Sequence, residues 1–188
     1  DPDVGFVKEF IGGQLLRDLD PDKLPEDPQA AIQVLESTLK SGCSMPVTVG
    51  GGVRTLEHFR SLLAAGADKV AINTAAVETP ELITQAAEKF GRQAVVVSID
   101  VKDGLVYSRS GSHRTDLRPH DFAATVARLG AGEILLNSIE RDGTLAGYDT
   151  GLIRDVASAV SIPVVAVGGA GTYQHLKEGL DAGAHAVA

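Results

Sequence analysis

Short runs of apolar, mostly β-branched residues alternate along this chain with longer stretches whose apolar residues recur every three or four positions. Short runs are typical of strands buried on both faces, and the longer spacing is typical of helices with one apolar face. The predicted strands are Val47–Val49, Lys69–Ile72, Ala94–Ile99, Glu133–Leu136, Pro163–Val167 and Ala186–Ala188. The predicted helices are Leu56–Ala65, Pro80–Phe90, Pro119–Leu129, Thr150–Val160 and Tyr173–Ala182.

The alternation of strands and helices implies parallel strands joined by crossover helices. An open doubly wound sheet and a closed barrel both have this order. An internal repeat favours the barrel, because the segment that begins at Pro46 repeats without a gap at Pro163, 117 residues later. That offset is about half of a typical barrel of about 250 residues. We therefore predict an α/β fold, a (β/α)₈ TIM barrel built from two half-barrel repeats.

The predicted elements fill most of such a barrel. The first predicted strand, Gln14–Leu19, follows a helix-like stretch at Val4–Phe10, and the last begins at His185. We count roughly seven strands where this class of barrel needs eight. We therefore expect residues 1–188 to form a single barrel domain that is incomplete, lacking the first strand and the end of the last βα unit.

Composition narrows the classes of function. Hydrophobic residues make up 44% of the chain and charged residues 22%, which is typical of a globular protein. The net charge of −8 argues against a nucleic-acid or anionic-membrane partner. No apolar run approaches the roughly 20 residues that span a bilayer, so we expect a cytoplasmic protein. Cys43 is the single cysteine and the histidines lack ligand spacing, so we expect no metal and no cofactor.

Glycine-rich turns follow two of the predicted strands. Gly51 and Gly52 lie in the first turn, and Gly168 and Gly169 lie at the repeated position. Glycines let the backbone approach an anion closely, and the following helix supplies amide donors and a positive dipole end. One such turn alone is as typical of an empty tight turn. Two copies on opposite halves of a barrel favour a substrate with phosphates at both ends.

Two further strand ends carry polar groups. Asn73 and Thr74 can complete the first phosphate site, or cap the helix that follows, or do both. Asp142-Gly143 reads as a turn, which can also form a phosphate-binding nest with Thr144. Ser110 lies in a predicted polar hairpin that can fold over a substrate.

Asp100 follows the strongly apolar run Ala94–Ile99. Its carboxylate should lie in the mouth of the barrel, where a raised pKa would suit a general acid or base. An ordinary strand-end residue is the alternative. The catalytic interpretation is favoured because barrel enzymes place catalytic groups at this end of their strands. Lys102 and Asp103 are assigned to a solvated loop.

Five segments together resemble the cyclase subunit of imidazole glycerol phosphate synthase. They are residues 46–54 (PVTVGGGVR), 67–77 (ADKVAINTAAV), 94–100 (AVVVSID), 130–144 (GAGEILLNSIERDGT) and 168–171 (GGAG). They have the order and spacing of that family. The resemblance extends from the first residue to the last and is clearest from Pro46 onward.

This resemblance implies a lyase of histidine biosynthesis. In that family a partner glutaminase releases ammonia, which passes through the barrel and reacts with a bis-phosphorylated ribulosyl aminoimidazole carboxamide. The products are imidazole glycerol phosphate and an aminoimidazole carboxamide ribotide. The resemblance therefore implies a heterodimer with the glutaminase, a small phosphorylated substrate and ammonia, and neither nucleic acid nor membrane.

The resemblance also implies roles for individual residues. Two aspartates act as acid and base in the family, and Asp100 matches the second. The first belongs to a first strand that we expect to be absent, as is a lysine on the loop after it. Asp18 or Asp20 matches a strand-end aspartate. The other matches are Gly51, Gly52, Asn73 and Thr74 at one phosphate site, Gly143, Gly168 and Gly169 near the other, Ser110 on a substrate-contacting loop, and Lys69 and Glu133 where ammonia enters.

Some positions depart from the family. Asn137 stands where many members have Thr, and Val167 where many have Ser. Residues 43–46, 98–102 and 135–139 also resemble a sister group that works with its own amidotransferase on nucleotide sugars for surface polysaccharide. The phosphoribosyl isomerase of the same pathway shares the repeat, but usually has Gly where Asn73 stands.

A non-catalytic, phosphate-binding fragment is the alternative from a different class. Without the first aspartate the acid/base pair would be broken, which costs about 10²–10⁴-fold in rate. An incomplete barrel also has an open sheet edge. We therefore expect residues 1–188 alone to be nearly inactive and poorly stable.

Overall fold

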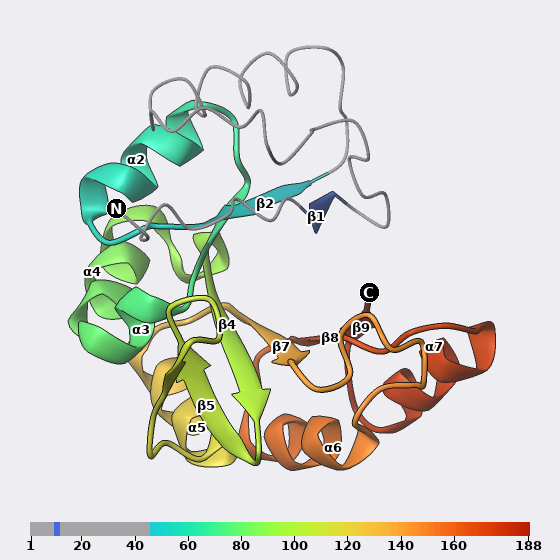
Figure 1. The fold of residues 1–188 in the computed structure, drawn as a ribbon. Coiled ribbons are helices and arrows are strands. Elements are labelled where there is room, and N and C mark those ends of the chain that lie inside the picture. The colour runs from blue at the N-terminus through green and yellow to red at the C-terminus, as the bar shows by residue number, and fades with distance from the viewer. Residues whose placement is uncertain (1–9, 12–45) are drawn as a thin grey trace.

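A computed structural model describes residues 10–11 and 46–188 of the chain (Figure 1). The strands are β1 (Phe10–Ile11), β2 (Val47–Gly50), β3 (Lys69–Ile72), β4 (Val95–Lys102), β5 (Leu105–Ser108), β6 (His113–Arg114), β7 (Glu133–Ser138), β8 (Val164–Val167) and β9 (Ala186–Val187). The helices are α2 (Leu56–Ala64), α3 (Thr74–Glu78), α4 (Glu81–Phe90), α5 (Pro119–Leu129), α6 (Thr150–Ala159) and α7 (Tyr173–Asp181), with a 3₁₀ turn, η2, at Arg92–Ala94.

Strands β2, β3, β4, β7, β8 and β9 lie side by side in that order, and each neighbouring pair is parallel. Figure 1 shows the sheet bent into an arc, with α2, α4, α5, α6 and α7 along its outer side. An open doubly wound sheet would carry helices on both faces. A curled parallel sheet with its helices on one side is instead part of a (β/α)₈ barrel, as the repeat predicts.

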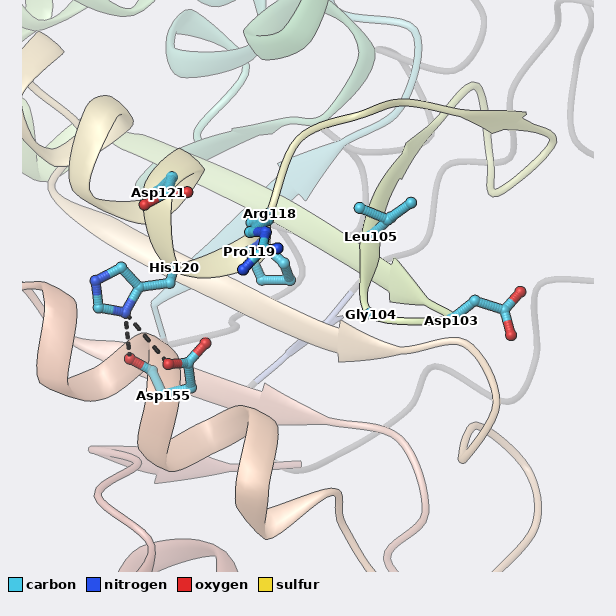
Figure 2. A pocket seen from close by; sticks show the side chains of 8 residues that line it. All are labelled: Asp103, Gly104, Leu105, Arg118, Pro119, His120, Asp121 and Asp155. Atoms are coloured by element: carbon cyan, nitrogen blue, oxygen red, sulfur yellow. Dashed lines mark hydrogen bonds and ion pairs between the residues drawn. The ribbon is translucent and has the colours of Figure 1, made fainter.

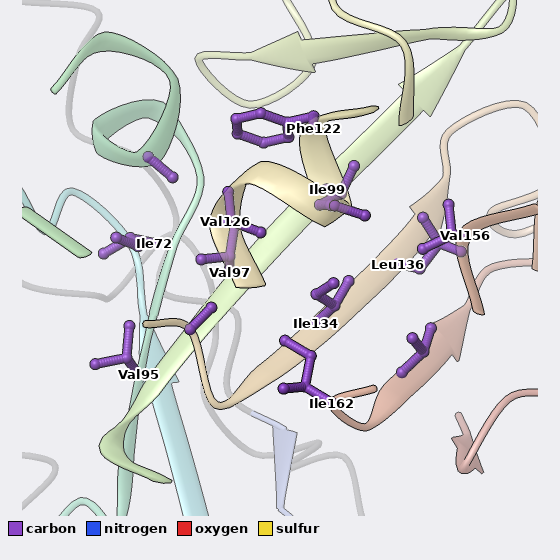
Figure 3. Close-up of a cluster of buried hydrophobic side chains, with 14 of the residues drawn as sticks. Ile72, Val95, Val97, Ile99, Phe122, Val126, Ile134, Leu136, Val156 and Ile162 are labelled. Carbon is purple, nitrogen blue, oxygen red and sulfur yellow. The ribbon is translucent and has the colours of Figure 1, made fainter. Parts of the chain in front are cut away.

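The core lies between the sheet and the helices (Figure 3). Along β4, Val95, Val97 and Ile99 are fully buried against the helices and belong to one apolar cluster with Phe122 and Val126 of α5. Burying each such side chain contributes about 1.5–3 kcal/mol. The alternate residues of β4 point to the concave face, which is where polar groups such as Ser98 and Asp100 lie half-buried.

The half-barrel repeat is also present in the hydrogen bonds at the starts of two helices. Thr55 and Thr172 cap α2 and α7, accepting from the amides of His58 and His175 at 3.2 and 3.3 Å. Each histidine in turn accepts, through Nδ1, from the amide four residues before it. Both histidines lie within predicted helices, Leu56–Ala65 and Tyr173–Ala182, and no role was predicted for them. The structure gives them the same helix-start role in both halves.

A second pair of residues, 117 positions apart, begins the repeated strands. The Val47 amide donates to the Asp68 carboxylate at 2.8 Å, and the Val164 amide lies 3.3 Å from Nδ1 of His185. The amides of Asp68 and His185 donate back to the carbonyls of the same two valines. Each pair therefore ties the start of one strand to the start of the next, in both halves.

Strands β7 and β4 extend beyond their predicted ends, β7 by two residues to Ser138 and β4 by three. Strand β4 continues to Lys102 rather than ending at Ile99, so Asp100 lies inside the strand and Lys102 is not in a loop. The reason is the antiparallel partner β5, which pairs with residues 100–102 across the tight turn Asp103–Gly104. Both turn residues have positive φ (51° and 71°), as a two-residue hairpin requires.

Near the N-terminus, Phe10 belongs to β1, which pairs antiparallel with β2, and not to a helix. Helix α3 was not among the predicted helices. The predicted strand Gln14–Leu19, the two candidate aspartates Asp18 and Asp20, and Cys43 lie outside the described residues.

Candidate functional site

Asp100 lies on the concave face of β4, in the part of the strand nearest its carboxyl end. The sheet register pairs it with Asn137 on β7, which is itself paired with Val167 on β8. Each of these three residues is half-buried. The structure therefore brings the predicted catalytic carboxylate level with the two positions that depart from the family pattern.

Two neutral groups donate to the Asp100 carboxylate. The Ser98 hydroxyl lies 3.2 Å from Oδ1, and the Asn137 side-chain amide lies 3.4 Å from the same oxygen. Both donors come from the concave face of the sheet, so they orient the carboxylate along that face. The other end of the Asn137 amide, Oδ1, is buried without a hydrogen-bond partner. The sequence did not assign either residue to the site.

The two glycine turns have the same backbone type but different surroundings. Gly51, Gly52, Gly168 and Gly169 all have positive φ, between 64° and 121°. A Cβ on Gly52 would meet nothing within 4 Å, whereas one on Gly168 would lie 2.8 Å from the Ser138 carbonyl oxygen. A Cβ on Gly169 would overlap the carbonyl of Gly147, whose amide donates to Gly169 at 2.7 Å. The second turn is therefore covered by the loop that follows β7, and the first is open.

Asn73 and Thr74 follow β3 and contact the β4–β5 hairpin. The Asn73 side-chain amide donates to the carbonyls of Ser98 at 3.2 Å and Tyr107 at 3.0 Å. The Thr74 hydroxyl accepts from the Arg109 amide at 3.0 Å. Asn73 makes no side-chain capping bond to α3. The predicted capping role of Asn73 is therefore wrong, and its amide protons are directed to backbone carbonyls.

Ser110 lies at the tip of the β5–β6 hairpin (residues 105–114). It is exposed, and with Arg109 and Gly111 it forms a run of three residues with positive φ. The neighbouring Arg109 side chain pairs with Glu78 of α3 at 2.8 Å. The hairpin that the sequence predicted after Asp100 is confirmed, and its tip is placed beside α3.

Asp142 and Gly143 lie in an exposed turn after β7. The amides of Arg141, Asp142 and Thr144 donate to backbone carbonyls within this turn. Gly143 has a φ of 74° and open space around it. The turn prediction is confirmed. A nest would have to use different amides from these three, because their hydrogens are already directed into the turn.

Lys69 and Glu133 lie at the opposite end of the sheet, where β3 and β7 begin. Their side chains form an ion pair of 2.6 Å that reaches across the intervening strand β4. Both side chains are mostly covered, with exposed fractions of 32% and 18%. Both residues begin predicted strands and Asp100 follows one, so they were expected at opposite ends of the sheet, and the structure agrees.

Tyr148 joins the loop after β7 to α7 and β9. Its side chain is buried, its hydroxyl donates to the Ala188 carbonyl at 2.8 Å, and its ring lies against Gly179. Burial raises the pKa of the Tyr148 phenol above its ordinary value of 10.0. The loop that covers the second glycine turn therefore rests on a protonated, buried tyrosine.

Stability should consequently fall at high pH. A raised pKa means that the folded state holds the phenol proton more tightly than the unfolded state. The contribution of the Tyr148 phenol to the free energy of unfolding is therefore complete below about pH 10 and is lost as the pH rises through the folded-state pKa. We expect Tyr148→Phe to lose stability less steeply than wild type between pH 9 and about pH 11. Urea unfolding across that range would measure this. Equal slopes for the two proteins would contradict it.

A cavity of about 680 Å³ lies outside this site (Figure 2). It lies between the Asp103–Gly104 turn and helices α5 and α6, where His120 Nδ1 is 3.3 Å from an Asp155 carboxylate oxygen. Its lining residues are Asp103, Gly104, Leu105, Arg118, Pro119, His120, Asp121 and Asp155. None of the predicted site residues lines it, and aspartates make up most of its charged groups, which disfavours a phosphate ligand there.

Among residues 10–11 and 46–188, no three His, Cys, Asp or Glu side chains come together as a metal site would require. Within the same residues, no helix is long and apolar enough to cross a membrane.

The chain is similar in sequence to a family of known proteins and to a curated relative. The family described as "Histidine biosynthesis protein" matches residues 14–188. A curated relative, the imidazole glycerol phosphate synthase subunit HisF of Sulfurisphaera tokodaii, is 50% identical over 157 residues. The match includes 81% of this chain, and the chain spans 63% of that relative's length.

Proposed function

The chain belongs to the histidine biosynthesis protein family, and we propose that it carries out the cyclase reaction of imidazole glycerol phosphate synthase, or forms the larger part of the domain that does. The proposal includes one barrel domain and a cytoplasmic location. The observation that carries the proposal is the position of Asp100. Its carboxylate lies on the concave face, between the two glycine turns of the half-barrel repeat.

The substrate in this proposal has a phosphate at each end. Gly51, Gly52 and Thr74 would line the site for one phosphate with Asn73 beside them, and Asp142, Gly143, Gly168 and Gly169 would contribute to the site for the other. Support comes from the four turn glycines: their positive φ values favour glycine, and a glycine backbone carries no Cβ that would block an anion. The two turns follow strands β2 and β8, on either side of β4 and Asp100.

Asp100 would exchange a proton with the substrate while ammonia is incorporated and the imidazole ring closes. Only one carboxylate of the acid/base pair is among the described residues, so the second group is not assigned. Ser110 would contact the substrate from the hairpin. The Ser98 and Asn137 donors would keep the carboxylate in one orientation, which limits its motion between proton transfers.

Ammonia would enter at the other end of the barrel. A partner glutaminase subunit would dock where β3 and β7 begin, and the Lys69–Glu133 pair would lie on the entrance path. The name of the relative, a synthase subunit, supports a partner of some kind. The mostly covered Lys69–Glu133 ion pair supports a specific arrangement of charged side chains at that end of the sheet.

The test is turnover of the bis-phosphorylated ribulosyl aminoimidazole carboxamide by the full-length protein with ammonium salt, followed by the loss of substrate absorbance in the ultraviolet. Appearance of imidazole glycerol phosphate would support the proposal. A folded protein that turns over nucleotide sugars and not this substrate would overturn it in favour of the polysaccharide group. Phosphate binding with no turnover of either would leave a binding protein.

A further inference from the structure

We propose that Asn73 is a positioning residue rather than a direct ligand of the substrate: its side-chain amide holds the β5–β6 hairpin against β4, which keeps Ser110 at the candidate site. The proposal rests on the proposed function and deepens it. It assigns to Asn73 a different task from the one that the family resemblance implies.

The number of donors on the Asn73 amide limits what it can bind. A primary amide has two N–H hydrogens. The Asn73 nitrogen lies 3.2 Å from the Ser98 carbonyl oxygen on β4 and 3.0 Å from the Tyr107 carbonyl oxygen on β5. Both hydrogens are therefore used between two strands of the hairpin. A phosphate would gain a donor from this amide only if one of those half-buried carbonyls lost its own.

The hairpin tip contacts the segments that follow β3 and β7. The Arg109 amide donates to the Thr74 hydroxyl at 3.0 Å, at the first residue of α3. A Cβ on Gly111 would lie 3.3 Å from Ile139, on the loop after β7. Strand β4 lies between β3 and β7 in the sheet. The tip that carries Ser110 therefore lies between the start of α3 and the loop after β7, which flank the strand that carries Asp100.

The hairpin tip has an unfavourable backbone conformation and needs support from its neighbours. Arg109 and Ser110 have φ values of 53° and 55°, which are unfavourable for residues with a Cβ. The Arg109–Glu78 ion pair is about half exposed and is consequently weak. The half-buried bonds of Asn73 are then the main polar contacts described between the body of the hairpin and the loop after β3. Without them the tip should relax away from the sheet.

Hydrogen exchange tests the structural half of the proposal. Asn73→Asp keeps the side-chain shape but turns a carboxylate oxygen toward the two carbonyls; Asn73→Ala simply removes the donors. In both variants of the full-length protein we expect amides of residues 105–114 to exchange at least about tenfold faster, with β7 and β8 unchanged. Unchanged exchange in the hairpin would overturn the proposal. So would uniformly faster exchange, because Asn73 would then support the whole fold.

A double-mutant cycle with Ser110→Ala tests the positioning half. If Asn73 acts through the hairpin, Asn73→Ala raises KM about tenfold and changes kcat less, and Ser110→Ala has no further effect in that background. Additive effects of the two changes would overturn the proposal, because Asn73 would then contact the substrate independently. If the wild-type protein shows no turnover, the proposed function fails, and the exchange measurement still decides whether Asn73 holds the hairpin.

Discussion

Asp100→Asn is expected to lower kcat/KM for the cyclase substrate by about 10²–10⁴-fold without changing the fold. Asparagine has the shape of aspartate, and its Oδ1 can still accept from the Ser98 hydroxyl and the Asn137 amide. It cannot take or return a proton at neutral pH. The loss should therefore appear in turnover and not in the melting temperature, measured by ultraviolet absorbance and by circular dichroism.

Asp103→Asn is the matched control for this change. Asp103 is exposed in the hairpin turn, three residues beyond Asp100, and has a φ of 51° that asparagine tolerates. The same loss of charge there should leave turnover within about twofold of wild type. If both variants lost activity alike, the net charge of the strand end would matter and not a proton transfer by Asp100. Full activity of Asp100→Asn would remove Asp100 from the acid/base role.

The sheet was predictable because burial on both faces leaves a visible signature. The apolar runs that became β3 and β7 need partners on either side, and their starts were predicted to the residue. The end of β4 was missed for a related reason. Beyond Ile99 one face of the strand carries Asp100 and Lys102, so the apolar run stops although pairing continues. The Asp103–Gly104 turn was the available signal, because this dipeptide between alternating residues predicts a hairpin.

The polar contacts of the site were not predictable in the same way. Periodicity shows which face of a strand a residue occupies, but not which neighbour it meets across the sheet. Asn137 reaches Asp100 because β7 pairs with β4 in one particular register. The Asp68–His185 correspondence was hidden for another reason. The two positions are 117 residues apart as the repeat requires, but the residues differ in type and share only an acceptor atom.

Gly169→Ala is expected to cost about 3 kcal/mol or more of unfolding free energy, because two independent penalties act at one position. The residue has a φ of 102°, a region that strains any side chain. Its Cβ would also overlap the Gly147 carbonyl oxygen, and the bond from the Gly147 amide prevents the loop from simply moving away. Urea unfolding would measure the loss. The loop after β7 should be displaced as well, with weaker phosphate binding.

Two other glycines each carry only one of these penalties: Gly143 has the backbone strain of positive φ, and Gly171 has the steric overlap of a Cβ. Gly143 has a φ of 74° and nothing within 4 Å of its Cβ position, so Gly143→Ala should cost only the backbone strain of about 1–2 kcal/mol. A Cβ on Gly171 would lie 2.5 Å from the Leu145 carbonyl oxygen, but its φ is not positive, and Leu145 lies in an exposed segment that can shift. A Gly169→Ala cost no larger than that of Gly143→Ala would show that the covering loop yields. The second turn would then be as open to an anion as the first.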